Sequence, residues 1–122
     1  MAEIEKLVII STVGTENFEK ATLPFVIATA AQATDVEVVI ILQSNAVELA
    51  KKGEAEKVKA PGLMPLKQLF DSYVEMGGKF LLCSPCLKER NIGKEDVIEG
   101  SEIIAAGTVV SEVMSAKSVL TY

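Results

Sequence analysis

The sequence of 122 residues has no histidine and no tryptophan, and it has only two cysteines, two tyrosines and four phenylalanines. Without histidine, the chain cannot use Ser-His-Asp or Cys-His catalysis or any imidazole metal site. With so few aromatic residues, the core must consist mainly of Val, Ile, Leu and Ala, a composition typical of parallel sheets.

The sequence also lacks an excess of positive charge and a long apolar run. Its formal net charge of −5 argues against nucleic acid as a main partner, because phosphate binding needs clustered Lys and Arg. No apolar run approaches the roughly 18 residues that span a bilayer, and residues 1–6 do not resemble a signal peptide. We therefore expect no contact with membranes and a cytoplasmic location.

Apolar segments and turn residues alternate along the chain in a pattern typical of an α/β protein. The segments of strand length cover residues 7–10, 36–42, 79–82, 102–106 and 118–122. Helical spacing and end signals predict helices at 17–33, 45–53, 65–76, 85–90 and 108–116, with a charged loop at 54–62. This alternation predicts a single domain over residues 1–122, a three-layer α/β/α sandwich around a mainly parallel five-stranded sheet, flavodoxin-like in architecture.

Both cysteines lie where the third predicted strand runs into a short helix, in the sequence Cys83-Ser84-Pro85-Cys86. Ser84 is a good N-cap and Pro85 suits the first helical position, so the free N–H groups of this helix should face the sulfur of Cys83. These dipoles, with Arg90 and a lysine nearby, predict that the pKa of Cys83 falls below that of a free thiol. Cys86, one turn into the helix, is predicted to be buried.

Ligand sites of open α/β sheets lie outside the carboxyl ends of the strands, and Cys83 lies at such an end. The loop after the first strand contains Thr12 and Gly14, and the turn after the second contains Asn45. We expect these two loops to form a rim of small polar groups around the thiol. Asn45 with a glutamate three residues later also resembles a helix capping box.

The spacing of the two cysteines fits a dithiol redox centre, half of a zinc site or a sulfur-transfer nucleophile with a second thiol. Cysteine is also a frequent core residue, so simple packing is a further alternative. A structural zinc site needs four ligands, and one chain offers only two strong ones here. We expect neither a metal nor a cofactor.

Several of these segments together resemble the DsrE/DsrF-like family. They are the strand end at 80–83, the basic stretch at 88–92 and the last two predicted strands, 102–107 and 118–122. The resemblance implies a small α/β/α domain that assembles into trimers or hexamers, as in TusBCD-type sulfur relays. It further implies that one Cys at this strand end accepts sulfane sulfur as a persulfide. By position, that role falls on Cys83, with Arg90 seven residues downstream.

The first functional hypothesis is therefore sulfur carriage by Cys83, with Cys86 as a possible resolving thiol and Ser84, Arg90, Thr12, Gly14 and Asn45 lining the site. Its partners would be sulfur donor and acceptor proteins or small persulfides, and the chain would form a homo-oligomer. A second hypothesis is a dithiol oxidoreductase that works through a disulfide between the two cysteines. A third is a non-catalytic assembly or ligand-binding subunit.

Overall fold

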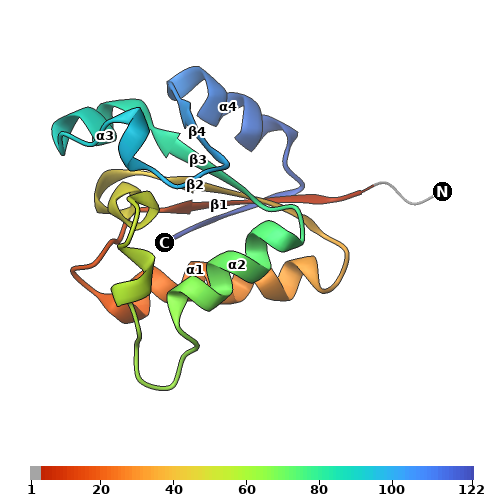
Figure 1. Cartoon of the computed structure of the whole chain (residues 1–122). Coiled ribbons are helices and arrows are strands. Elements are labelled where there is room, and N and C mark those ends of the chain that lie inside the picture. The colour runs from red at the N-terminus through yellow and green to blue at the C-terminus, as the bar shows by residue number, and fades with distance from the viewer. Residues whose placement is uncertain (1–3) are drawn as a thin grey trace.

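A computed structural model describes residues 4–122 and shows one sheet whose five strands are all parallel (Figure 1). The strands are β1 (Lys6–Ser11), β2 (Glu37–Leu42), β3 (Lys79–Cys83), β4 (Ser101–Ile104) and β5 (Ser118–Thr121). Their spatial order is β4-β3-β2-β1-β5, so the chain moves outward from β1 and then crosses back to place β5 on its other side. The predicted α/β sandwich is confirmed.

The helices form the two outer layers of the sandwich. Four are α-helices, namely α1 (Phe18–Gln32), α2 (Leu66–Glu75), α3 (Ser84–Glu89) and α4 (Ala106–Ser115). Within residues 4–122 there are also three short 3₁₀ helices: η1 (Ser44–Ala50), η2 (Ala55–Lys57) and η3 (Lys94–Asp96). Figure 1 shows α1 and α2 on one face of the sheet and α4 on the other, while α3 follows β3 at its carboxyl end.

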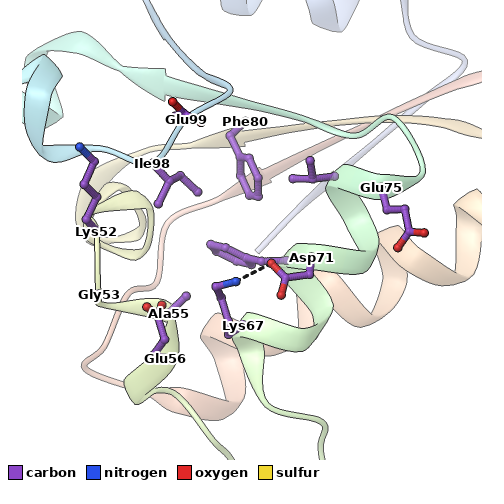
Figure 2. Close-up of a pocket in the computed structure, with 12 residues that line it drawn as sticks. Lys52, Gly53, Ala55, Glu56, Lys67, Asp71, Glu75, Phe80, Ile98 and Glu99 are labelled. Atoms are coloured by element: carbon purple, nitrogen blue, oxygen red, sulfur yellow. Dashed lines mark hydrogen bonds and ion pairs between the residues drawn. The ribbon is translucent and has the colours of Figure 1, made fainter.

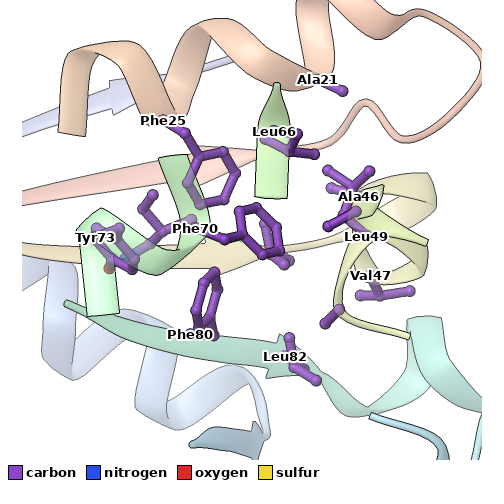
Figure 3. Close-up of a cluster of buried hydrophobic side chains, with 14 of the residues drawn as sticks. Ala21, Phe25, Ala46, Val47, Leu49, Leu66, Phe70, Tyr73, Phe80 and Leu82 are labelled. Atoms are coloured by element: carbon purple, nitrogen blue, oxygen red, sulfur yellow. The ribbon is translucent and has the colours of Figure 1, made fainter. Parts of the chain in front are cut away.

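The larger part of the core lies between the sheet and the α1–α2 layer. Phe25 of α1 packs against Phe70 and Tyr73 of α2 and against Phe80 of β3, with ring centroids 4.5–5.9 Å apart (Figure 3). Few aromatic residues thus suffice to fill this core, because four of the six in the sequence pack together there. Aliphatic side chains fill the remainder of the core.

The opposite face of the sheet carries a smaller aliphatic cluster. Val8, Val39, Ile41, Leu81 and Ile104 form it, and partly buried side chains of α4 pack against them. No residue of α4 is fully buried, so this layer covers the sheet thinly. β2 and β3, which lie between the two layers, are consequently apolar on both faces, as the unbroken apolar runs predict.

Two predictions about local structure are wrong in detail. Residues 45–53 do not form a capped α-helix; η1 starts at Ser44 after Gln43, and Asn45 does not cap it. The segment 54–62 is not a plain loop, since it contains η2. In the first case, Asn45 makes tertiary contacts with Arg90 and Glu16 in place of a local cap.

None of the helices within residues 4–122 is long and apolar enough to cross a membrane.

Candidate functional site

The thiols lie at the carboxyl end of β3. Cys83 is the last residue of this strand, and α3 begins at the next residue, Ser84, with Pro85 in its first turn. The predicted strand-to-helix junction is therefore present, shifted by one residue: Cys83, not Ser84, is the N-cap residue. Ser84 already has helical geometry and is the first residue of α3. Cys86 is therefore the third residue of the helix and lies on its first turn.

The two sulfur atoms form a close pair. Their Sγ atoms lie 2.8 Å apart, and the backbone N–H of Ser44 donates to Cys86 Sγ at 3.1 Å. Ser44 has a φ of 51°, a left-handed conformation that is costly for a residue with a side chain. Both thiols are half-buried, so the prediction that Cys86 is fully buried is wrong.

The predicted direction of the Cys83 pKa shift is also wrong. Burial raises the pKa of Cys83 above that of a free thiol, and the adjacent Cys86 thiol raises it further by hydrogen bonding and charge repulsion. The backbone N–H of Cys86 and the Arg90 guanidinium lower this pKa, but their effect is smaller. At Cys83, burial and the Cys86 thiol therefore outweigh the backbone N–H of Cys86 and the Arg90 guanidinium.

Arg90 belongs to a hydrogen-bond network that connects the end of α3, the start of η1 and the loop after β1. Its Nε and Nη2 donate to Asn45 Oδ1 at 3.2 and 2.7 Å, and its Nη1 donates to the backbone oxygen of Cys86 at 3.1 Å. The Asn45 amide in turn donates to Glu16 Oε2 at 3.1 Å, and the backbone N–H of Gly14 donates to Glu16 Oε1 at 2.9 Å. Asn45 therefore holds the guanidinium beside the α3 turn.

Glu16 is the member of this network that the sequence analysis missed. Burial acts to raise its pKa, but hydrogen bonds from Asn45, its own backbone and Gly14, together with the charge of Arg90, hold the pKa below its usual value. Glu16 lies in the same loop as Gly14, and a carboxylate next to a glycine turn is the signal that could have identified it.

The other predicted site residues divide into two groups. Gly14 is in close contact with the site, since a Cβ atom there would lie 2.2 Å from the backbone oxygen of Asn45. Thr12 faces elsewhere: its backbone N–H and its hydroxyl both donate to the backbone oxygen of Tyr122. The structure brings Gly14, Asn45 and Arg90 together with the thiols, whereas Thr12 anchors the C-terminus.

A small cavity lies against Cys83. Its volume is about 260 Å³, and it is lined by Gln43, Cys83, Pro85, Ile104, Ala105, Ala106, Val109 and Val110. A larger hollow of about 570 Å³ opens between α2 and the segment that precedes β4 (Figure 2). Phe70, Phe80 and Ile98 form its floor, and Lys67 pairs there with Asp71. No cysteine lines this larger hollow, so the cavity next to the thiols is the one relevant to their chemistry.

Within residues 4–122, no group of three or more Cys, Asp or Glu side chains is placed to hold a metal ion. The site brings together two adjacent thiols, a guanidinium and backbone donors.

The chain belongs to the DsrE/DsrF-like family, whose model matches residues 5–122. The uncharacterized protein MJ0760 of Methanocaldococcus jannaschii is 33% identical over 91% of this chain, which spans 40% of that relative's length. The uncharacterized protein MJ0989 of the same organism is 29% identical, with 96% of this chain and 99% of that protein covered.

Solved structures share the fold. The ychN protein from E. coli has a TM-score of 0.75 at 21% identity, with 98% of this chain and all of that chain covered. MTH1491 from Methanobacterium thermoautotrophicum, a protein of unknown function, has a TM-score of 0.73 at 13% identity, with 98% and 100% covered. At these identities the likeness establishes the architecture, and the role of the thiols has to be argued from the site.

Proposed function

We propose that this protein carries sulfane sulfur, with Cys83 as the residue that accepts it as a persulfide. The family is associated with sulfur relay in general, and this membership supports the proposal. The observation that carries it is the pair of free thiols 2.8 Å apart at the carboxyl end of β3, next to a cavity and a fixed guanidinium.

In the loading step, the sulfur of Cys83 attacks the outer sulfur of a donor persulfide, R–S–SH. A bond forms between Cys83 Sγ and that outer sulfur, and the donor S–S bond breaks, with its electron pair leaving on R–S⁻. The proton of the Cys83 thiol goes to this leaving group, so that the products are the Cys83 persulfide and R–SH. Attack by a thiolate on a sulfur–sulfur bond follows ordinary thiol–disulfide exchange.

Two unloading routes are open to the loaded site. The thiol of an acceptor protein can attack the outer sulfur and take it as a new persulfide, which regenerates Cys83. Alternatively, Cys86 attacks the inner sulfur; a Cys83–Cys86 disulfide forms and HS⁻ leaves. The separation of the two sulfur atoms supports the second route, which needs a later reductant such as a cellular dithiol to restore both thiols.

Arg90 has a positioning and electrostatic role in this scheme. A persulfide is more acidic than a thiol, and a cation close to the α3 turn favours its anionic form. Because Asn45 and the Cys86 carbonyl fix three of the guanidinium's hydrogen bonds, Arg90 does not have to be ordered when sulfur arrives. Glu16 acts through Asn45, as a positioning residue.

The partners in this proposal are sulfur donor and acceptor proteins or small persulfides, and the chain acts as a homo-oligomer, a trimer or hexamer. Met114 of α4 supports self-association, since this apolar side chain is 79% exposed. Light scattering on the purified protein measures the subunit count. A monomer at micromolar concentration would contradict this part of the proposal.

Intact-mass analysis after incubation with a desulfurase or inorganic polysulfide tests the loading step. We expect a mass gain of one sulfur atom in the wild type and in Cys86→Ser, and none in Cys83→Ser. Cys86→Ser should also keep the added sulfur for longer, because the disulfide-forming release is lost. An adduct of equal size in Cys83→Ser, or none in the wild type, would refute the proposal.

A dithiol oxidoreductase is the second candidate function, and the same contact between the two sulfur atoms favours it. It predicts catalytic turnover of disulfide substrates and a defined reduction potential for the Cys83–Cys86 pair. The two candidates separate clearly: Cys86→Ser abolishes disulfide turnover but leaves sulfur loading intact.

A further inference from the structure

We propose that the cavity beside Cys83 favours small-molecule persulfide donors whose organic group is short, apolar and uncharged over those whose organic group bears carboxylates, such as glutathione persulfide. This inference rests on the proposed function and names the substrate class of the same site.

The cavity is apolar on nearly all sides. Ile104, Val109, Val110, Pro85 and the methyl groups of two alanines form its wall, and Gln43 has the one polar side chain besides the thiol among the lining residues described. No charged side chain is among these lining residues. A carboxylate entering this space would lose hydration without gaining a charged side chain as a partner, which is unfavourable.

The cation of the site does not offset this cost. Arg90 is not among the cavity's lining residues, and its hydrogen bonds go to Asn45 and to the backbone oxygen of Cys86, which do not line it either. The guanidinium thus donates on the Cys86 side of the thiol pair, whereas the cavity is lined by Cys83 and not by Cys86.

The size of the cavity limits the donor as well. At about 260 Å³, it is slightly smaller than the range of roughly 300–1,000 Å³ that holds drug-sized ligands. This volume favours a short alkyl or allyl group beside Cys83 over a tripeptide. The step that this cavity serves is the loading reaction given above: R–S–SH and the Cys83 thiol yield the Cys83 persulfide and R–SH.

Two neighbouring residues at the start of α4 provide a matched pair of variants. Ala106 lines the cavity, so Ala106→Lys places a cation at its edge. Gly107 does not line it, and a Cβ atom there has no heavy atom within 4 Å, so Gly107→Lys adds the same charge in open space. Both substitutions put a lysine into the first turn of the same helix, and their effects on its dipole are therefore alike.

The experiment compares the rate constants for loading of Cys83 by allyl persulfide and by glutathione persulfide. Each rate constant is obtained from the gain in intact mass over time. In the wild type and in Gly107→Lys, we expect allyl persulfide to react faster by about tenfold or more. In Ala106→Lys, that ratio should fall several-fold. Equal rates for both donors in the wild type, or equal changes in the two variants, would overturn the inference.

A second measurement keeps this inference separate from the proposed function. In Cys86→Ser, the only thiol is Cys83, and iodoacetamide and iodoacetate probe it with reagents of similar size and different charge. Each rate is divided by the rate of the same reagent with free cysteine. A preference for iodoacetamide that decreases in Ala106→Lys but not in Gly107→Lys supports the selective cavity even if no persulfide forms. No preference refutes it even if sulfur loading is observed.

Discussion

The hydroxyl group of Tyr73 connects α2 to the sheet, and its removal offers a sharp test of how the strand that holds Cys83 is secured. Tyr73 is fully buried. Its oxygen accepts from the backbone N–H of Ile40 in β2 at 3.0 Å and donates to the backbone oxygen of Lys79 in β3 at 2.5 Å. The hydroxyl therefore bridges β2 and β3 where their pairing begins.

Tyr73→Phe preserves the ring packing and removes only this bridge. The Ile40 N–H is then buried without a partner, at a cost of about 1–3 kcal/mol, and the Lys79 carbonyl loses one donor. We expect the free energy of unfolding to fall by about 2–3 kcal/mol. With an unfolding entropy of about 2.1 cal/mol/K per residue, a chain of 122 residues should lose roughly 8–12 °C in Tm.

The second tyrosine is the matched control. Tyr122 is 38% exposed, so Tyr122→Phe should change the free energy of unfolding by less than about 0.5 kcal/mol. Urea unfolding of both variants, with thermal unfolding as a second measurement, gives the comparison. If Tyr73→Phe costs no more than Tyr122→Phe, the hydroxyl bridge contributes nothing and the argument from buried hydrogen bonds fails.

Alkaline pH provides an independent check on the same group. Burial raises the pKa of Tyr73 well above its usual value, although the backbone hydrogen bonds act in the opposite direction. A tyrosine whose pKa is higher in the folded state stabilises the fold fully below the unfolded value of about 10 and loses this contribution as pH rises above it. The stability difference between wild type and Tyr73→Phe should accordingly shrink above about pH 10.

Two further substitutions test the site itself. Cys86→Ala removes a thiol that raises the pKa of Cys83. The alkylation rate of Cys83 should therefore reach its half-maximum at a lower pH than in the wild type. An unchanged or higher midpoint would contradict this expectation. Gly14→Ala forces a Cβ atom to within 2.2 Å of the Asn45 backbone oxygen and should cost about 1–3 kcal/mol in urea unfolding. Gly107→Ala, which meets no heavy atom within 4 Å, is its control and should be neutral or slightly stabilising; equal effects would refute the close-contact argument.

The local order of strands and helices was predictable because it depends on patterns between neighbouring residues. Unbroken apolar runs such as that of β2 occur where a strand is buried on both faces, and glycine pairs and prolines mark the ends of helices. The position of Cys83 at the end of a strand follows from the same patterns. The pairing of the two thiols on one turn is a consequence of their spacing.

The direction of the Cys83 pKa shift and the Arg90 network were decided by the tertiary structure. Desolvation depends on which distant side chains surround a thiol. The sequence therefore shows nearby groups that lower the pKa of Cys83 but not the burial that raises it. Asn45 fits a local cap by sequence, yet folding brings it within hydrogen-bonding distance of Arg90, 45 residues away, and the stronger charge-assisted contact prevails. Composition and periodicity determined the sheet and the position of the thiols at the end of β3. The environment of the thiols was decided by tertiary structure, because the segments that contain Asn45 and Arg90 are far apart in the chain and meet only in the folded protein.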